Sequence, residues 1–298
     1  MPPCALCPRS CRADRAAGQR GYCGAAGTKI KCARAALHMW EEPCISGKQG
    51  SGTVFFSGCP LRCVYCQNRD IARAGAGKDI TPERLSEIFL ELQEKGAANI
   101  NLVTPTHYTP EIVQALKQAF VLGLKLPIVY NCSGYEKVET LQMLEGIVDI
   151  YLTDFKYMEA ETAARYSNAP DYPQTAQEAL REMVRQMGGK EAEFDEEGMM
   201  KRGVIVRHLL LPGHLKNAKE VVRYVYETYG NQVYISLMNQ YTPLPGMEKW
   251  PELNRKVTKR EYERLLDFAV ELGVENGFIQ EGGTAEESFI PAFDCEGI

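Results

Sequence analysis

The sequence lacks any long hydrophobic run, and this absence narrows the classes of protein to consider. No apolar stretch approaches the roughly 18 residues of a candidate membrane span, and the first residues contain no apolar segment like that of a signal peptide. There is no internal repeat, no low-complexity tract and no excess of positive charge, since the net charge is -5. This charge balance gives no indication of a surface that binds nucleic acid as a whole, and a local basic patch stays open as an alternative. We expect a cytoplasmic protein that binds neither membrane nor nucleic acid.

Cysteine, by contrast, is abundant and unevenly distributed. The chain of 298 residues contains eleven cysteines, of which nine lie within the first 66 residues. Because a reducing compartment disfavours structural disulfides, clustered cysteines in such a protein indicate metal binding or catalysis. The odd number also fits a complete set of disulfides poorly. The cysteine chemistry is therefore expected at the N-terminal side of the fold.

The hydrophobic pattern divides the chain into three regions. Residues 1–50 predict a cysteine-rich, metal-binding extension with little periodicity, residues 51–240 alternate short β-rich runs with amphipathic helices, and residues 241–298 predict a C-terminal extension packed on the rest. Strands are expected at Thr53–Ser57, Asn99–Val103, Pro127–Asn131, Ile147–Thr153, Val204–Leu210 and Gln232–Leu237. Helices are expected at Pro82–Glu94, Pro110–Leu122, Lys137–Leu144, Ala176–Met187, Ala218–Tyr229 and Lys259–Leu272. Apolar strands separated by such helices predict an α/β fold with a parallel sheet, either an incomplete barrel or a doubly wound sheet.

Two further features are expected outside this alternation. The Asp195–Gly198 turn predicts a β-hairpin that extends the fifth of these strands. The C-terminal region is expected to contain a final turn at Gly282–Gly283.

The first group of candidate ligands is Cys59, Cys63 and Cys66, which follow the first predicted strand with C-x3-C-x2-C spacing. Three thiolates on one short loop can bind three irons of a [4Fe–4S] cluster and leave the fourth iron open to a substrate or cofactor. Loops at the carboxyl ends of parallel strands are where such folds bind ligands. A structural zinc site is the alternative, and it would need a fourth ligand.

The second group is Cys4, Cys7, Cys11 and Cys23. Four thiolates suffice either for a tetrahedral zinc site or for an auxiliary [4Fe–4S] cluster, and both alternatives stay open. Cys32 and Cys44 are candidates to replace one of these ligands, although each is more typical of a buried or loop residue.

The C-x3-C-x2-C loop, with aromatic Tyr65 directly before the last cysteine, resembles the signature of the radical S-adenosylmethionine superfamily. The resemblance implies a partial (β/α)6, TIM-like barrel with an N-terminal cysteine-rich extension. It also implies that the methionine moiety of S-adenosylmethionine chelates the open iron. One electron then cleaves the cofactor to a 5′-deoxyadenosyl radical, which abstracts a hydrogen atom from the substrate. Cys59, Cys63 and Cys66 are thus the expected catalytic and metal-binding residues.

The same resemblance implies roles for polar residues at successive strand ends. Thr104 and Thr106 stand where related enzymes carry a segment that meets the methionine amino group, although Thr104–Tyr108 departs from the usual Gly-Gly-Glu-Pro pattern. The residues expected to contact the cofactor at the later strand ends are Asn131, Ser133, Asp154, Lys156 and Arg207.

Each residue at the later strand ends has an expected contact of its own. Asn131 and Ser133 would hydrogen-bond the ribose or the carboxylate, and Lys156 would pair with that carboxylate. Asp154 would either bind a monovalent cation or neutralise Lys156. Arg207 would grip a carboxylate in bidentate fashion. His107, in the segment after the second strand, is more typical of a structural hydrogen-bonding residue than of a catalytic one.

Several segments, among them Glu42–Gly47 and Phe289–Pro291, resemble uncharacterised iron–sulfur homologues of pyruvate formate-lyase activating enzyme. The first functional hypothesis is therefore abstraction of a glycyl hydrogen from a partner glycyl radical enzyme, with an electron donor such as flavodoxin or ferredoxin. The second is a radical enzyme that acts on a small molecule or peptide with the help of an auxiliary cluster. The third is a non-catalytic iron–sulfur or zinc protein.

Overall fold

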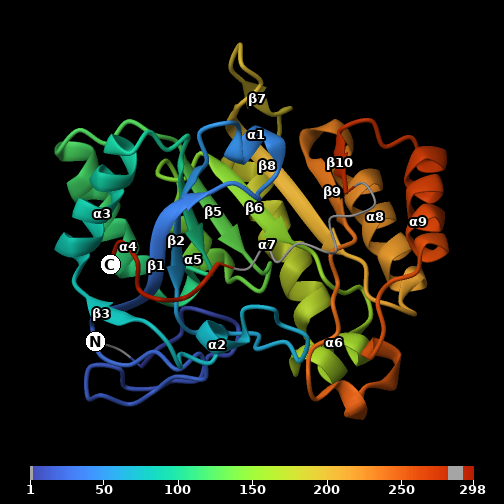
Figure 1. Ribbon diagram of the computed structural model, residues 1–298, viewed down its shortest axis with the longest axis horizontal. Helices are drawn as coiled ribbons and strands as arrows, with labels where there is room; N and C mark the ends of the chain where they lie inside the picture. The colour runs from blue at the N-terminus through green and yellow to red at the C-terminus, as the bar shows by residue number, and fades with distance from the viewer. Residues whose placement is uncertain (1–2, 281–290) are drawn as a thin grey trace.

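A single curved sheet forms the centre of the protein in the computed structural model, which describes residues 3–280 and 291–298 (Figure 1). The spatial order of its main path is β10-β9-β8-β6-β5-β4-β2-β1-β3, and β7 pairs with β8. The strands are β1 (Ile30–His38), β2 (Ser51–Phe56), β3 (Lys78–Ile80), β4 (Ile100–Val103), β5 (Ile128–Cys132), β6 (Ile150–Asp154), β7 (Glu193–Phe194), β8 (Met200–Leu209), β9 (Tyr234–Met238) and β10 (Gly277–Ile279).

The strands from β2 to β10 along this path run parallel, whereas β1 is antiparallel to both β2 and β3. The carboxyl ends of all the parallel strands therefore lie at one edge of the sheet. The sheet does not close on itself, so the fold is the predicted partial barrel.

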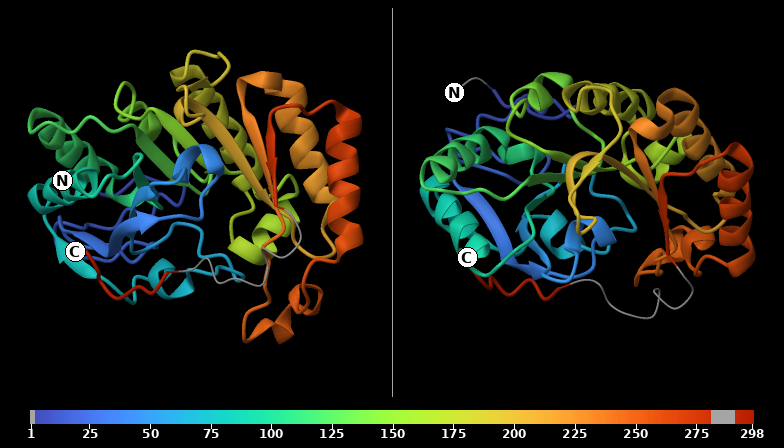
Figure 2. Two further views of the ribbon diagram at one scale, coloured as in Figure 1. Left: turned by 45° about the horizontal axis from the view of Figure 1, so that its top comes forward. Right: turned by 90° about the horizontal axis from the view of Figure 1, so that it is seen from above.

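Helices cover the convex face of the sheet, as the view from above shows (Figure 2). The longer helices are α3 (Pro82–Glu94), α4 (Thr109–Val121), α5 (Val138–Gln142), α6 (Ala160–Ser167), α7 (Tyr172–Gln186), α8 (Leu215–Tyr229) and α9 (Lys259–Leu272). Two short helices, α1 (Pro43–Ser46) and α2 (Arg69–Ala72), lie instead beside the concave interior. Short 3-10 turns occupy Thr106–Tyr108, Gly230–Gln232, Met247–Lys249 and Pro251–Leu253. In the described parts of the chain, no helix is long and apolar enough to cross a bilayer.

The six predicted strands and six predicted helices are confirmed, and two helices have the predicted bounds because their start signals are strong. Thr81 caps α3 by accepting a hydrogen bond from the Arg84 backbone N–H, with Pro82 at the first turn. Thr258 and Glu261 form a capping box at the start of α9. The hairpin is also confirmed, since β7 pairs antiparallel with β8. The turn expected at Gly282–Gly283 lies outside the described residues.

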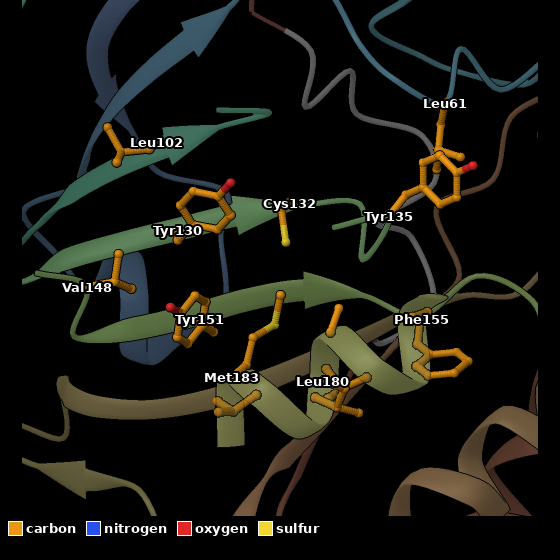
Figure 3. Packing of buried hydrophobic residues seen from close by; sticks show 14 of the residues in the cluster. Leu61, Leu102, Tyr130, Cys132, Tyr135, Val148, Tyr151, Phe155, Leu180 and Met183 are labelled. Atoms are coloured by element: carbon orange, nitrogen blue, oxygen red, sulfur yellow. The ribbon is translucent and has the colours of Figure 1, made fainter. Parts of the chain in front are cut away.

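Side chains alternate between the two faces of the strands, as a period of two requires. On β5 and β6, Tyr130 and Tyr151 are fully buried in the main core, where Leu180 and Met183 of α7 pack beside them (Figure 3). The neighbouring Asn131 instead lines a cavity on the concave face. The sheet thus places its core on one side and a polar interior on the other.

The concave interior is closed at the amino ends of the parallel strands by α1. Cys44 and Ile45 of α1 form a small apolar cluster with residues that include Ile150 and Leu152 of β6. This packing closes the interior at the amino ends of the strands. It also brings the segment just before α1 against the polar interior.

Strand β1 was not expected from the sequence, yet it belongs to the same sheet as the strands that follow it. Its outer edge is covered by the C-terminal residues, because Ala35 N–H donates to the Glu296 carbonyl at 2.9 Å and Cys295 N–H donates to the Ala33 carbonyl at 3.0 Å. The C-terminal segment therefore packs along the edge of β1.

Candidate functional site

A cavity of about 350 Å³ lies on the concave face, at the carboxyl edge of the sheet. Its walls come from the loop after β2, the carboxyl ends of β4, β5, β6, β8, β9 and β10, and the segment before α1. The sequence-predicted residues that line it are Cys59, Cys63, Cys66, Thr104, Asn131, Ser133, Asp154, Lys156 and Arg207. The fold thus brings together residues that are separated by up to 148 positions in the sequence.

The three cysteines of the C-x3-C-x2-C loop lie within electrostatic reach of one another. Burial raises the pKa of the Cys59 thiol to about 11 and that of Cys66 to about 12, and the charges of the neighbouring cysteines raise both further. The Ser167 hydroxyl donates a hydrogen bond to Cys63 Sγ at 2.9 Å, and the Leu61 N–H donates to Cys59 Sγ at 3.4 Å. All three sulfurs therefore belong to one partly enclosed group.

These thiols do not converge on a single point. Among the residues the structure describes, no three histidine, cysteine, aspartate or glutamate side chains form a group that could hold one metal ion. A tetrahedral zinc ion needs its sulfur ligands about 2.3 Å from the metal. An iron–sulfur cubane instead takes each thiolate on a different iron, and so accepts ligands that are spread apart.

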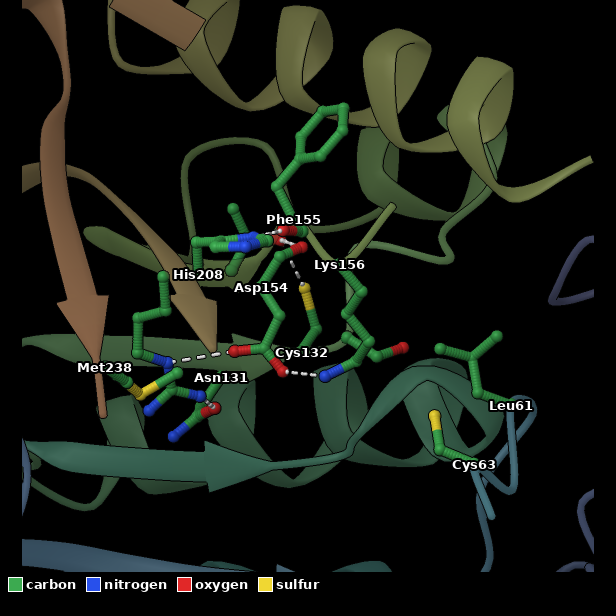
Figure 4. A network of polar contacts seen from close by, with 12 residues as sticks. Leu61, Cys63, Asn131, Cys132, Asp154, Phe155, Lys156, His208 and Met238 are labelled. Atoms are coloured by element: carbon green, nitrogen blue, oxygen red, sulfur yellow. Dashed lines mark hydrogen bonds and ion pairs between the residues drawn. The ribbon is translucent and has the colours of Figure 1, made fainter. Parts of the chain in front are cut away.

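A buried ionic network occupies the cavity wall at the ends of β6 and β8 (Figure 4). Asp154 Oδ2 pairs with Lys156 Nζ at 2.6 Å, and its Oδ1 accepts from Arg207 Nε at 3.0 Å. Burial opposes the charge on Asp154, but the two cations outweigh it and lower the pKa of the carboxyl group. Burial likewise opposes the charge on Lys156, and Asp154 outweighs it and raises the pKa of the ammonium group. Since both carboxylate oxygens are taken, the observed role of Asp154 is to pair with cations of the chain.

Arg207 extends this network to the opposite wall. Its Nη1 donates to Glu41 Oε2 at 3.0 Å and its Nη2 donates to Asn131 Oδ1 at 2.6 Å. Burial opposes the charge on Arg207, but Asp154, Glu41 and Glu42 outweigh it and raise the pKa of the guanidinium group. The guanidinium is thus fixed by three elements before any ligand binds.

Glu41 and Glu42 were not identified from the sequence. Glu42 is buried, lines the cavity, and has an Oε2 atom without a hydrogen-bond partner. Burial raises the pKa of its carboxyl group, although Arg207 acts in the opposite direction. The sequence does carry a signal for these two acids. Residues 1–40 contain a single acidic residue, Asp14, so the adjacent Glu41 and Glu42 before Pro43 stand out as candidate site residues.

The two threonines after β4 have different environments. Thr104 lines the cavity with a backbone φ of 57°, a conformation that is strained for a β-branched residue. Thr106 is buried away from the cavity wall, and its hydroxyl donates to Glu136 Oε1 at 2.8 Å. Thr104 can therefore contact a ligand in the cavity, whereas Thr106 anchors the turn after β4 through its hydrogen bond to Glu136.

Tyr172 of α7 organises the cavity wall without having been predicted to do so. Its hydroxyl accepts from the Lys156 N–H at 2.9 Å and donates to the Ser133 carbonyl at 2.8 Å. Next to it, Gly134 has a φ of 76°, and a Cβ there would collide with the Asp154 carbonyl oxygen. No sequence motif marks this tyrosine, because it acts through backbone groups of two other elements.

The N-terminal cysteines form a separate group next to the C-x3-C-x2-C loop. Cys7 and Cys23 are buried, Cys4 is half-buried and Cys11 is exposed. Cys32 lies inside β1 and Cys44 packs in the apolar cluster at α1. The His107 ring is buried against the Ser57 carbonyl at 2.8 Å, which is a structural position.

Comparison with known proteins identifies the family of this chain. The sequence profile of the Radical SAM superfamily matches residues 53–225, which is more than half of the 298 residues. The chain belongs to the radical SAM superfamily. Members of this family are enzymes that use a [4Fe–4S] cluster and S-adenosylmethionine.

The curated relatives share 22–30% of their aligned residues with this chain. The uncharacterized protein MJ0674 of Methanocaldococcus jannaschii is 30% identical over 277 residues, which cover 89% of this chain and 74% of that protein. The pyruvate formate-lyase-activating enzymes of Listeria monocytogenes and Listeria innocua are 22% identical over 211 residues, which cover 67% of this chain and 78% of theirs.

Solved structures with a similar arrangement include Streptococcus suis SuiB bound to S-adenosylmethionine, with a TM-score of 0.49 and 14% identity over 76% of this chain. The chain spans about half the length of SuiB, since the match covers 49% of that protein. Methylornithine synthase (PylB) also has a TM-score of 0.49, with 13% identity over 74% of this chain and 68% of that one.

Proposed function

We propose that Cys59, Cys63 and Cys66 hold the [4Fe–4S] cluster and that the adjoining cavity binds S-adenosylmethionine. The observation that carries this proposal is that the three thiols and the polar strand ends face one cavity. The cavity also contains a polar atom suited to a ligand, because Ser133 Oγ is buried and has no partner. Such an atom costs about 1–3 kcal/mol unless a ligand or water satisfies it.

Charge complementarity assigns the remaining contacts. Lys156 is the cation positioned for the methionine carboxylate, since Cys63 lies on its side of the cavity (Figure 4). The strained Thr104 and the orphaned Ser133 hydroxyl supply polar groups for the methionine or ribose moieties. Asn131 is held by Arg207 and also donates to Glu41 Oε1 at 3.2 Å, so it can orient a ribose hydroxyl.

Cys59, Cys63 and Cys66 would hold the cluster, which when bound would supply the one electron needed to cleave the sulfonium C–S bond of S-adenosylmethionine, with methionine as the leaving group. The chain's own residues hold the cofactor in a partly enclosed cavity, which limits quenching of a reactive species by solvent. A one-electron donor of the flavodoxin or ferredoxin type would reduce the cluster. The leading substrate is a glycyl residue of a partner enzyme, a choice supported by the similarity to pyruvate formate-lyase-activating enzymes.

A second substrate class is a small molecule or peptide that enters the cavity itself. The observation that favours it is the acidic end of the cavity, where Glu41 and Glu42 close the interior and Glu42 Oε2 has no partner in the protein. A buried carboxyl oxygen without a hydrogen-bond partner is unfavourable, and a hydrogen-bond donor on a substrate would satisfy it.

Anaerobic reconstitution followed by an assay for 5′-deoxyadenosine tests the cofactor chemistry. The wild type is expected to release 5′-deoxyadenosine from S-adenosylmethionine with dithionite, and Cys63→Ala is expected to fall to background because the cluster loses one of three ligands. Cys295→Ala is the matched control, since this half-buried cysteine does not line the cavity. Equal product from wild type and Cys63→Ala would overturn the proposal.

The substrate classes are then separated with pyruvate formate-lyase as the probe. Glycyl-hydrogen abstraction predicts a glycyl radical signal in electron paramagnetic resonance after incubation with the active enzyme. Product formation without that signal would favour the second substrate class.

A further inference from the structure

We infer that Cys4, Cys7, Cys11 and Cys23 hold a second iron–sulfur cluster, docked on the loop of the catalytic cysteines, through which electrons enter the site. This inference rests on the proposed function for its electron acceptor. The ligand group itself stands on separate observations. These are the arrangement of the N-terminal thiols, the space kept open between them, and the contacts that join this segment to the loop after β2.

The backbone folds the N-terminal thiols into one compact unit. Cys4 N–H donates to the Ala13 carbonyl and Arg12 N–H donates to the Cys4 carbonyl, both at 3.0 Å, so the chain from Cys4 to Ala13 closes into a loop. Cys23 lies within electrostatic range of Cys4, Cys7 and Cys11. Four thiols that are 19 positions apart at most in the sequence therefore share one neighbourhood.

Gly21 marks a space between two of these sulfurs. A Cβ at this position would lie 3.3 Å from Cys11 Sγ and 3.5 Å from Cys23 Sγ, although the backbone of Gly21 is not in the left-handed region. A glycine that is not required by its own φ angle is explained by the need to keep a side chain away from the two thiols. The position thus preserves room next to the ligand group.

The place of the four thiols favours a redox cluster over a structural ion, because Cys23 contacts the chain directly before Cys59. Four thiolates also suffice for one zinc ion, and counts of iron and zinc separate the two. A cubane takes one thiolate on each of its four irons, so the same four cysteines saturate it and leave no open corner. A saturated cluster suits electron transfer, in contrast to the three-cysteine loop, which leaves one iron open.

The N-terminal unit is packed directly on the catalytic loop. The Cys23 carbonyl oxygen lies 2.7 Å from where a Cβ on Gly58 would stand, and Gly58 immediately precedes Cys59. Arg9 Nε donates to the Pro60 carbonyl at 2.8 Å. The Arg62 guanidinium lies 5.2 Å from the centroid of the Tyr22 ring, next to Cys23. A ligand of one group is therefore in van der Waals contact with the chain that carries the other.

This arrangement gives a direction for electron flow. Cys11 is exposed, so one corner of the N-terminal group reaches solvent, and the buried Cys23 lies on the side of the catalytic loop. Cys59, Cys63 and Cys66 line the cavity. A reduced flavodoxin- or ferredoxin-type protein gives one electron to the N-terminal cluster. That cluster passes one electron to the catalytic cluster and returns to its oxidised state, with no bond made or broken in the transfer.

Iron and sulfide counts on the anaerobically reconstituted full chain test the site. Wild type and the Cys295→Ser control are expected to hold about eight irons, and both Cys7→Ser/Cys11→Ser and Cys59→Ala/Cys63→Ala/Cys66→Ala about four. Gly21→Val is a second variant that keeps every thiol, and it is expected to lose the same four irons because its side chain fills the space between Cys11 and Cys23. One zinc and about four irons in wild type, or no loss of iron in either N-terminal variant, would overturn the proposal.

The role in electron entry is tested by comparing two reductants in the 5′-deoxyadenosine assay. With reduced flavodoxin, Cys7→Ser/Cys11→Ser should lose most of the wild-type rate. With dithionite, which is small enough to reach the catalytic loop directly, the loss should be a much smaller factor. An equal loss with both reductants would overturn the relay. Absence of product from wild type with either reductant, together with eight irons, would instead count against the proposed function while leaving the second cluster in place.

Discussion

At the scale of single residues, Glu136 shows how burial alone sets a pH dependence. Its carboxyl group is fully buried behind the cavity wall, where Thr106 donates to Oε1 at 2.8 Å and Tyr130 donates to Oε2 at 3.2 Å. Burial raises the pKa of Glu136 to about 8, against the opposing effect of these hydrogen bonds. The folded protein therefore keeps this proton at neutral pH.

The sign of the resulting stability change follows from linkage. The unfolded chain releases the proton near pH 4.5, and the folded chain releases it near pH 8, so the free energy of unfolding falls as pH rises between these values. The contribution is up to about 1.4 kcal/mol per pH unit. Glu136→Gln keeps the size of the side chain and removes the titration. Urea unfolding should therefore show the variant gaining about 2–3 kcal/mol over wild type between pH 5.5 and pH 7.5.

The exposed Glu139→Gln is the control for this prediction, because it makes the same change nearby on the surface. Its unfolding free energy should follow that of wild type at both pH values. The same pH dependence in Glu136→Gln and wild type would show that the buried carboxyl group does not hold its proton.

At the scale of elements, the sequence predicted those parts of the fold that carry local signals. The helix at Pro82–Glu94 was located by its cap and its periodicity, and the strands after residue 51 by continuous apolar runs. Strand β1 was not predicted because Lys31 and Arg34 interrupt its apolar pattern. Its hydrogen-bond partners are β2, β3 and the C-terminal residues Cys295 and Glu296. Long-range pairing leaves no local trace in a sequence.

The residues of the candidate site also fall into two groups, those with a local signal in the sequence and those without one. The cysteine loop was located by its spacing, and Asp154, Lys156 and Arg207 by their places at strand ends. Glu41 and Tyr172 act through partners 166 and 16 positions away, so only the folded chain shows what they contact. Thr106 has a hydroxyl group suited to a ligand, but the 3-10 turn at Thr106–Tyr108 directs it to Glu136 instead.

The C-terminal residues give a prediction that belongs to this scale. Residues 294–296 cover the outer edge of β1 through backbone hydrogen bonds, and Phe293 packs edge-on against Phe55 with ring centroids 5.5 Å apart. Deletion of residues 292–298 should leave the Ala33–Ala35 edge unpaired, and an exposed strand edge promotes association between chains. We expect a lower midpoint of thermal unfolding and concentration-dependent light scattering.

A substitution separates the backbone contribution of this segment from its ion pairs. Arg34 pairs with Asp294 at 2.9 Å and with Glu296, and both acids are largely exposed. Arg34→Gln removes these pairs but keeps the backbone hydrogen bonds, so it should cost only about 0–1 kcal/mol and cause no scattering. Scattering by Arg34→Gln equal to that of the deletion would assign the effect to charge rather than to the strand edge.

At the scale of the whole molecule, Arg207 ties three neighbouring strands to the segment before α1 across the concave interior. From β8 it reaches Asp154 on β6, Asn131 on β5 and Glu41 in the segment before α1. Its side chain is only 15% exposed, and those of Asp154 and Glu41 are 17% and 9% exposed. One cation therefore holds the concave wall together from three directions.

Arg207→Met should consequently destabilise the fold by about 3–5 kcal/mol, because it leaves two buried carboxylates without their shared partner. Arg207→Met/Glu41→Gln should recover part of that loss by removing one of the two charges. The surface Arg84→Met is the matched control, since Arg84 also pairs with two acids, Glu87 and Glu91, whose side chains are 61% and 42% exposed, and it should cost about 0–1 kcal/mol. The free energies of urea unfolding of the three variants test this prediction. If Arg207→Met cost no more than Arg84→Met, water would have to reach the Asp154 and Glu41 carboxylates, and the enclosed cavity on which cofactor binding depends would be absent.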